Sequence, residues 1–260
     1  ISNQKEPIEG FVISPDGKKV LFIRSVKSGK KPGEQYADLP GASGRVVDDL
    51  MYKHWDHWVE SVPHPFLADL EGNRLNNIVD LLEGEPYEAP LAPFGGIEQL
   101  AWSPDGSTIA YTSRKKTGKE YAESTNSDIY FYDLASGETR NMTEGMMGYD
   151  VNPQFSPDGR YLAWQSMERD GYESDKNRLF VMELATGEKT YVTESFDYNT
   201  DAFSWESDSK TIYLVAPVQG TTQLYATNIA TRSITPITSG MHDYTSVAPG
   251  DGVLIATRPS

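Results

Sequence analysis

The chain has 260 residues, including 22 glycines, 16 prolines and 11% aromatic residues, a composition typical of many short strands joined by tight turns. Its net charge of −15 argues against nucleic acid or an anionic membrane surface as a partner, because like charges repel. The absence of cysteine excludes disulfides, thiolate metal sites and a cysteine nucleophile, and no apolar run approaches the ~18 residues that span a bilayer.

A turn motif recurs along the chain and divides it into repeats. The tetrapeptide Ser-Pro-Asp-Gly occurs at residues 14–17, 103–106 and 156–159, with degenerate copies at 206–209 and 249–252. Serine accepts backbone N–H bonds, proline presets φ, aspartate caps locally and glycine supplies the positive φ of a tight hairpin. We interpret its aspartates as turn residues rather than catalytic groups, because the same residue recurs in every copy.

The first repeat is expected over residues 10–84, with an insertion near 28–62. Within the insertion, residues 50–59 (LMYKHWDHWV) indicate a short amphipathic helix or an extended aromatic arm, preceded by a glycine-rich loop.

Three histidines in and beside this insertion are a candidate site for a divalent metal. His54 and His57 stand three residues apart, and His64 follows. No H-E-x-x-H motif or ligating carboxylate spacing accompanies them. The favoured interpretation is therefore that Trp55 and Trp58 pack the insertion against the sheet, with the histidines on its polar side, and no metal or cofactor is expected.

Three further repeats are expected over residues 97–143, 150–193 and 200–238, and the start of another over 243–260. Each repeat reads as strand, Ser-Pro-Asp-Gly turn, strand, variable loop, strand, glycine turn and strand. Four antiparallel strands repeating roughly every 50 residues describe the blades of a propeller. The sequence therefore predicts an all-β fold: one domain over 1–260, a partial β-propeller of four-stranded antiparallel blades, with about four to five blades.

Carboxylates occupy a common place in these repeats. Glu98, Asp150, Asp201 and Asp243 each lie five or six residues before the turn, at the start of the innermost strand. Such strand starts converge at one mouth of a propeller, where a carboxylate ring attracts an ammonium group such as a peptide amino terminus. These residues are the candidate substrate-binding residues; the alternative is that they are solvated loop carboxylates in an acidic chain.

At residues 52–58 (YKHWDHW), followed by HPFLAD at 64–69, the sequence resembles the amino-terminal propeller of bacterial prolyl-oligopeptidase-family serine peptidases, in particular the dipeptidyl peptidase V and acylaminoacyl-peptidase branch. The aromatic insertion carries this resemblance, because TolB-like and other propellers share the turn repeats. The resemblance implies a parent protein in which a carboxy-terminal α/β-hydrolase domain with a Ser, Asp and His triad follows the propeller. It also implies that the propeller covers the active site, restricts access to short peptides and helps position the substrate terminus.

No catalytic residue is expected within this chain. It has no G-x-S-x-G nucleophile elbow, the nearest approach being residues 41–44, and no phosphate loop or dinucleotide fingerprint. The double-glutamate motif of dipeptidyl peptidase IV is not recognisable either. The expected function is therefore the noncatalytic cap of a serine exopeptidase that acts on peptides. The start without methionine and the resemblance favour a periplasmic or secreted protein over the cytoplasmic alternative.

Two alternative functions stay open, namely a stand-alone TolB-like propeller that acts as a protein-binding scaffold, and a propeller lyase or glycosidase that uses histidine, metal and carboxylates. About four and a half repeats also leave strand edges unpaired, so self-association through these open edges is expected.

Overall fold

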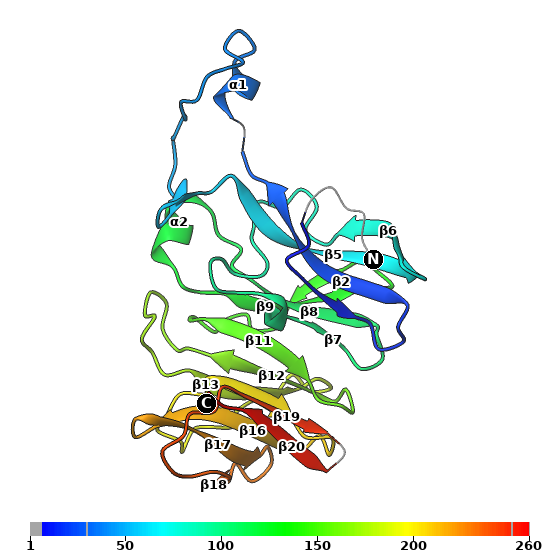
Figure 1. Cartoon of the computed structure of the whole chain (residues 1–260), viewed down its shortest axis with the longest axis vertical. Coiled ribbons are helices and arrows are strands. Elements are labelled where there is room, and N and C mark those ends of the chain that lie inside the picture. Colours follow the sequence, from blue (N-terminus) through cyan, green and yellow to red (C-terminus); the bar gives the residue numbers. More distant parts are fainter. Residues whose placement is uncertain (1–6, 30, 251, 260) are drawn as a thin grey trace.

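The computed structural model describes residues 7–29, 31–250 and 252–259. Residues 1–6, 30, 251 and 260 lie outside the described part; they include the first residues of the predicted domain and Asp251 of the last degenerate turn. The described chain consists mainly of antiparallel sheets that follow one another in chain order along the long axis of the molecule (Figure 1). Neither of its two described α-helices has the length or the apolar content to cross a lipid bilayer.

Four-stranded sheets make up most of this described part. The first sheet has the order β1–β2–β5–β6 and contains β1 (Gly10–Ile13), β2 (Lys19–Lys27), β5 (Ser61–Glu71) and β6 (Arg74–Asp80). The second follows a 3₁₀ turn, η1 (Ile97–Gln99), and contains β7 (Leu100–Trp102), β8 (Thr108–Ser113), β9 (Asp128–Asp133) and β10 (Thr139–Asn141).

The later sheets repeat this pattern of sequential antiparallel pairing. The third contains β11 (Asp150–Phe155), β12 (Tyr161–Ser166), β13 (Arg178–Glu183) and β14 (Lys189–Tyr191). The fourth contains β15 (Ala202–Trp205), β16 (Thr211–Val218), β17 (Thr221–Asn228) and β18 (Ile234–Pro236). A last, two-stranded sheet pairs β19 (Ser246–Gly250) with β20 (Val253–Thr257). This architecture confirms the predicted all-β fold with four-stranded antiparallel blades.

The Ser-Pro-Asp-Gly turns have the predicted chemistry. The Ser103 hydroxyl donates to Asp105 Oδ1 (2.6 Å) and accepts the N–H of the residue five positions on (2.9 Å). Gly106 has φ of 72° and closes the turn by donating to the Ser103 carbonyl (2.9 Å). The same bonds recur at residues 14–17 and 156–159. Each turn thus joins the first two strands of its blade through four residues that satisfy one another locally.

Alternation along the strands builds a core on both faces of a sheet, because successive side chains point to opposite sides. Leu21 and Ile23 of β2 pack with Trp102 of the second sheet. Val20 and Phe22 point the other way and pack on the opposite face of the first sheet. Similar clusters join the second sheet to the third and the third to the fourth, so each sheet is stabilised by its neighbours.

The connection from β2 to β5, residues 28–60, forms an arm that projects from the first sheet (Figure 1). It contains α1 (Pro32–Gln35) and a small hairpin of β3 (Lys53–His54) and β4 (His57–Trp58). The helical alternative for residues 50–59 is therefore wrong. The segment is rich in aromatic residues, which favour strands over helices, and His54 and His57 face each other across the hairpin.

The two tryptophans of the arm are not buried against the first sheet, contrary to the prediction. Trp55 is 69% exposed and Trp58 42% exposed, and Trp58 lies under the guanidinium of Arg45 (4.1 Å), within the arm itself. His64 is buried in β5, with its Nδ1 2.9 Å from a carboxylate oxygen of Asp80. Among the described residues, no group of three or more His, Asp or Glu side chains is placed to hold a metal ion.

The long loops between strands and the connections between sheets lie at one edge of the fold, which we call the mouth. The first strand of each complete blade starts there and the second strand ends there, as the pairing of Leu100 with Tyr111 illustrates. Loops between second and third strands therefore lie at the mouth, and so do the connections from one sheet to the next. The arm and α2 (Gly118–Glu123) belong to such loops; in Figure 1 the arm projects at the top and α2 lies at the left.

Candidate functional site

A cleft of about 970 Å³ opens at the mouth of the second and third sheets, and we call it the mouth cleft. Its walls come from the arm hairpin, from the connection before β7, from the start of β11, and from the loops at 114–125 and 167–177. Aromatic and acidic side chains are frequent in its lining, which includes Trp55, Phe94, Tyr121, Tyr149, Tyr172, Glu98, Glu123 and Glu173.

Arg114, which directly follows β8, is the buried cation of this cleft. Its Nη2 lies 3.2 Å from Glu88 Oε1, its Nη1 donates to the Ser124 carbonyl (2.9 Å), and its guanidinium covers the Tyr121 ring (4.0 Å). Burial raises the pKa of Tyr121, which keeps the hydroxyl protonated so that it donates to Glu88 (2.5 Å). The Arg114 Nε–H has no hydrogen-bond partner among the described residues. The cluster is therefore ordered and retains one spare donor.

Asp170 joins the loops of the second and third sheets across the rim of the cleft. One of its oxygens, Oδ1, accepts the Ser124 hydroxyl (2.7 Å) and the backbone N–H groups of Thr125 (2.8 Å) and Asn126 (3.2 Å). In return, the N–H of Gly171 donates to the Thr125 hydroxyl (2.9 Å). Burial opposes ionisation of Asp170, but these hydrogen bonds outweigh it and lower the pKa of the carboxyl.

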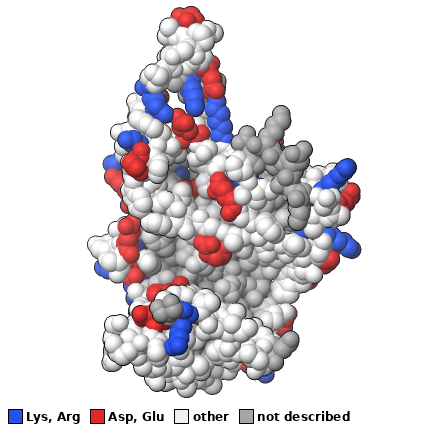
Figure 2. Space-filling model, in the orientation of Figure 1, with Lys and Arg blue, Asp and Glu red and all other residues white. Residues whose placement is uncertain are grey.

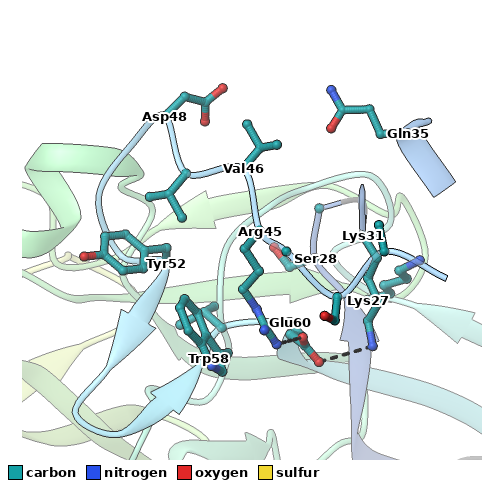
Figure 3. Close-up of a pocket in the computed structure, with 16 residues that line it drawn as sticks. Lys27, Ser28, Lys31, Gln35, Arg45, Val46, Asp48, Tyr52, Trp58 and Glu60 are labelled. Carbon is teal, nitrogen blue, oxygen red and sulfur yellow. Dashed lines mark hydrogen bonds and ion pairs between the residues drawn. The ribbon is translucent and has the colours of Figure 1, made fainter. Parts of the chain in front are cut away.

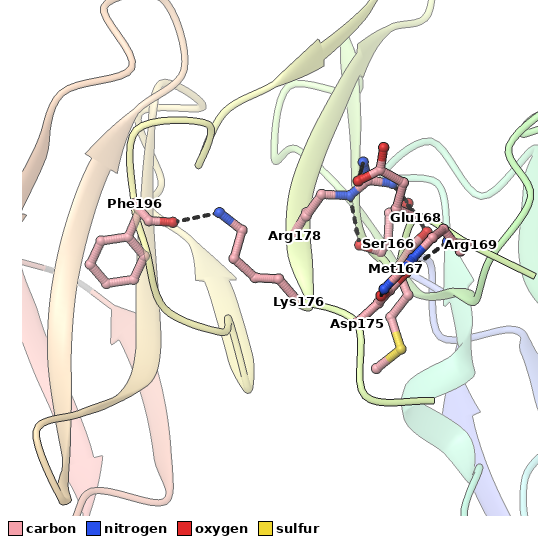
Figure 4. Close-up of polar contacts among 8 residues, drawn as sticks. All are labelled: Ser166, Met167, Glu168, Arg169, Asp175, Lys176, Arg178 and Phe196. Carbon is pink, nitrogen blue, oxygen red and sulfur yellow. Dashed lines mark hydrogen bonds and ion pairs between the residues drawn. The ribbon is translucent and has the colours of Figure 1, made fainter. Parts of the chain in front are cut away.

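The loop 167–177 is braced by its own charges as well (Figure 4). Arg169 pairs with Asp175 inside the loop, and Arg178 donates to two backbone carbonyls at the end of β12 (3.2 and 3.1 Å). Lys176 reaches the following connection, where its Nζ donates to the Phe196 carbonyl (2.8 Å). These contacts hold the part of the rim that supplies Tyr172 and Glu173 to the cleft.

The four predicted carboxylates do not share one cavity. Of these four described residues, only Glu98 lines the mouth cleft, and its carboxylate folds back to accept the N–H of Gly96 (2.7 Å). Asp201 and Asp243 are exposed and lie outside the cleft, whereas Asp150 is fully buried. Equivalent positions in the repeat thus have different environments, and a role in substrate binding stays a prediction.

Asp150 is the first residue of β11, and its carboxyl has an unusual protonation equilibrium. Its Oδ1 accepts the indole N–H of Trp164 (2.8 Å), and its Oδ2 has no partner among the described residues. Burial raises the pKa of Asp150 to about 7, against the smaller opposing effect of the hydrogen bond from Trp164. The group therefore belongs to the interior and titrates near neutral pH.

A second hollow, of about 630 Å³, lies within the arm (Figure 3). Lys31 and Arg45 both pair with the Glu60 carboxylate at its side, and hydrogen bonding from Arg45 is the main cause of a lowered Glu60 pKa. These pairs are well exposed, so each adds little stability. In the view of Figure 2, acidic and basic side chains are interspersed along the arm rather than gathered in a patch of one sign.

Sequence reasoning missed Phe94, Arg114 and Asp170 as functional candidates. Arg114 follows a strand with no recognisable motif, and Asp170 resembles any other loop carboxylate. A signal for Phe94 did exist, because it lies directly before Gly95 and Gly96, a composition typical of a sharp turn that presents a side chain.

The sequence is similar to a known domain family and to two curated proteins. A family model described as the TolB beta propeller domain matches residues 97–259. Dipeptidyl-peptidase 5 of Porphyromonas gingivalis is 54% identical over 253 residues, which is 97% of this chain and 37% of the relative. Dipeptidyl-peptidase 5 of Porphyromonas endodontalis is 50% identical with the same coverage. The chain thus spans 37% of the length of both relatives.

Solved structures share the fold at low sequence identity. Acylaminoacyl peptidase of Pyrococcus horikoshii superimposes with a TM-score of 0.68 at 14% identity, covering 99% of this chain and 36% of that structure. A putative TolB of Agrobacterium tumefaciens gives 0.58 at 17% identity, covering 98% of this chain and 71% of the other. The resemblance to dipeptidyl and acylaminoacyl peptidase propellers is confirmed. Because the family model covers more than half of its residues, the chain belongs to the TolB β-propeller domain family.

Proposed function

We propose that this chain is the propeller part of a serine dipeptidyl peptidase, and that its mouth cleft receives and positions the end of a peptide substrate. One observation carries the proposal: a preformed cleft lies at the mouth of a chain that is 54% identical to a dipeptidyl-peptidase 5. Its volume of about 970 Å³ is large enough for a short peptide and too small for a folded domain.

The charges of the cleft favour a cationic peptide end. Glu98, Glu123 and Glu173 line it, whereas its buried cation, Arg114, is already paired with Glu88. The net local charge is therefore negative, which attracts an ammonium group and repels a carboxylate. An extended peptide would deliver its amino terminus more readily than its carboxyl terminus.

Two residues that line the cleft carry a buried polar atom without a partner among the described residues. Arg114 Nε–H is a spare donor, and the Asn152 side-chain oxygen is an acceptor without a partner among the described residues. Buried polar groups without partners are costly, so a shift of these side chains that lets a peptide pair with them would be favoured. An extended peptide carries both a donor and an acceptor at nearly every residue.

A rigid rim supports the gating part of the proposal. Asp170 ties two mouth loops together, and Lys176 ties the second of them to the next connection. A rim that opens little admits thin, extended chains and excludes folded ones. We propose that this selection precedes hydrolysis by an α/β-hydrolase domain outside these residues.

A graft tests this function. The 253 matched residues of Dipeptidyl-peptidase 5 of P. gingivalis are replaced by the corresponding residues of this chain. We expect the graft to hydrolyse dipeptidyl reporter peptides and the 260-residue chain alone to hydrolyse none. A graft that folds, as judged by circular dichroism and thermal unfolding, yet cleaves neither dipeptidyl nor acyl-peptide reporters would favour the scaffold function instead.

The same graft tests gating. Its rates are compared for a tetrapeptide, a thirty-residue unfolded peptide and a folded protein that ends in the same sequence. We expect the rate to fall steeply with size, and we expect a graft carrying Asp170→Ala to lose part of that selectivity. Equal size dependence in both grafts would contradict a gating role for the rim.

A further inference from the structure

Two large aromatic side chains stand exposed at the entrance of the mouth cleft. Phe94 is 80% exposed and Trp55 is 69% exposed, although both line the cleft. Their rings meet edge to face with centroids 5.3 Å apart. Trp55 comes from the arm hairpin and Phe94 from the connection before β7, so two separate segments bring the pair together. Clustered exposed aromatic side chains beside a polar cleft indicate a binding surface.

The backbone of Trp55 has a strained, left-handed conformation, and packing of the Trp55 side chain does not compensate for this strain. Trp55 is the first central residue of the two-residue turn between β3 and β4, and its φ is 53°. Glycine is the usual residue at such a place, because a side chain on a left-handed backbone is strained. The site nevertheless carries the largest side chain, and that side chain buries little of itself. A strained residue that nevertheless stays mostly exposed points to function.

Phe94 is exposed but held in place. The N–H of Gly95 donates to the Leu91 carbonyl (2.7 Å), which closes a tight turn around Phe94. The buried Gln99 side chain accepts the N–H of Leu91 (2.8 Å) from below. A Cβ at Gly95 would lie 2.5 Å from the Leu91 oxygen, so the turn requires glycine here. The backbone that carries the ring is therefore held in place, while the ring itself stays exposed.

We propose that Trp55 and Phe94 form an aromatic clasp that binds an apolar or aromatic side chain of a peptide entering the mouth cleft. This inference rests on the proposed function. It adds a preference for an apolar or aromatic substrate side chain, which the carboxylates of the cleft do not select. A peptide fits better than a flat protein surface, because both rings line a concave site that continues inward to Arg114. The clasp would discriminate by side chain, while the acidic lining acts on the peptide end.

Binding measurements on the 260-residue chain test the clasp. The probes are free-amino-terminus pentaalanines with a single phenylalanine at each of the first four positions, and matched peptides with serine instead. Isothermal titration calorimetry gives each Kd. We expect phenylalanine to tighten binding about tenfold at one position, and we expect Trp55→Gly and Phe94→Ala each to remove most of that difference.

The matched control is Trp58→Ala. Trp58 lies in the same hairpin and is also exposed, but it does not line the mouth cleft, so the preference for phenylalanine should persist. Thermal unfolding separates binding from folding, because glycine relieves the strained turn. Trp55→Gly should therefore unfold at the same temperature as the unchanged chain or higher, while it loses the preference.

The outcomes are distinct. A phenylalanine preference that survives both Trp55→Gly and Phe94→Ala overturns the clasp and leaves the proposed function intact, as does binding that ignores the side chain. Absence of binding by every peptide contradicts the proposed function and the clasp with it. Protection of Trp55 from acrylamide quenching that rises with protein concentration, without peptide, would show that a second copy covers the pair, and this also overturns the clasp.

Discussion

We expect Asp150 to make the stability of the protein depend on pH. Its pKa of about 7 lies above the ordinary value of 3.8, because burial disfavours the charged form. The folded protein therefore binds this proton more tightly than the unfolded chain does. The stabilisation is complete below the unfolded pKa and is lost as pH rises through the folded pKa, which here means between about pH 4 and pH 7.

Asp150→Asn should remove most of this dependence, because asparagine keeps an oxygen for Trp164 and carries no charge. The unchanged chain is expected to lose up to roughly 4 kcal/mol of unfolding free energy between pH 4 and pH 7.5 through this group, and the variant much less. Urea unfolding at both pH values measures the difference. Asp243→Asn is the control, since Asp243 has the corresponding place in the repeat but is exposed. Equal pH dependence in the unchanged chain and the Asp150 variant would contradict the assignment.

Loops rather than strands shape the cleft, and Asp170 links two of them. Replacing it with alanine removes three accepted hydrogen bonds, two of them from backbone N–H groups. Asp170→Ala should therefore lower the free energy of unfolding by about 1–3 kcal/mol and speed hydrogen exchange in residues 118–127. Because the pKa of Asp170 is lowered, its stabilisation is present at neutral pH and is lost as pH falls through the folded pKa.

Glu168→Ala is the matched control for this loop. Glu168 is 71% exposed and pairs with Arg178 at 3.5 Å, a contact that solvent screens. We expect a loss below about 1 kcal/mol and unchanged exchange in residues 118–127. An equal effect of both substitutions on exchange would show that any change in the loop at 167–177 loosens the rim, and that Asp170 has no special part in it.

At the scale of the whole molecule, the two ends of the described stack are apolar. Val253 and Ile255 of β20 are 59% and 65% exposed, and Phe11 of β1 is 61% exposed. Among the described strands, β20 pairs with β19 alone. An unpaired strand edge with apolar side chains promotes association between chains.

Self-association of the 260-residue chain therefore remains our prediction. Light scattering coupled to gel filtration should show a mass that rises with concentration, and Ile255→Lys should reduce this rise, because a charge on the edge must be desolvated on contact. Met241→Lys adds the same charge at an 88% exposed site outside the described strands and should have little effect. A mass that stays monomeric at every concentration would contradict the prediction.

The blades could be predicted because the sequence signals for their turns and strands lie within a few consecutive residues. The Ser-Pro-Asp-Gly turn is complete within four residues, since serine, aspartate and glycine satisfy one another and the adjacent N–H groups. Repetition of that turn, together with alternating apolar residues, indicates four-stranded units without knowledge of any distant contact. The aromatic insertion carried the resemblance, but its own conformation was ambiguous between helix and hairpin.

The cleft depended on contacts between distant residues and could not be predicted. Asp150 and Asp201 hold the same place in the repeat, yet only Asp150 is buried, because burial depends on which neighbours cover a residue. Asp170 accepts a hydrogen bond from Ser124, which lies 46 residues earlier in the chain. The ring of Trp55, in the arm hairpin, contacts that of Phe94, in the connection before β7. The sequence by itself determined the turns, the strands and their order. Tertiary packing alone decided which polar groups are buried and which aromatic rings stay exposed to solvent. Burial depends on contacts between residues far apart in the chain, and the local sequence does not encode these contacts.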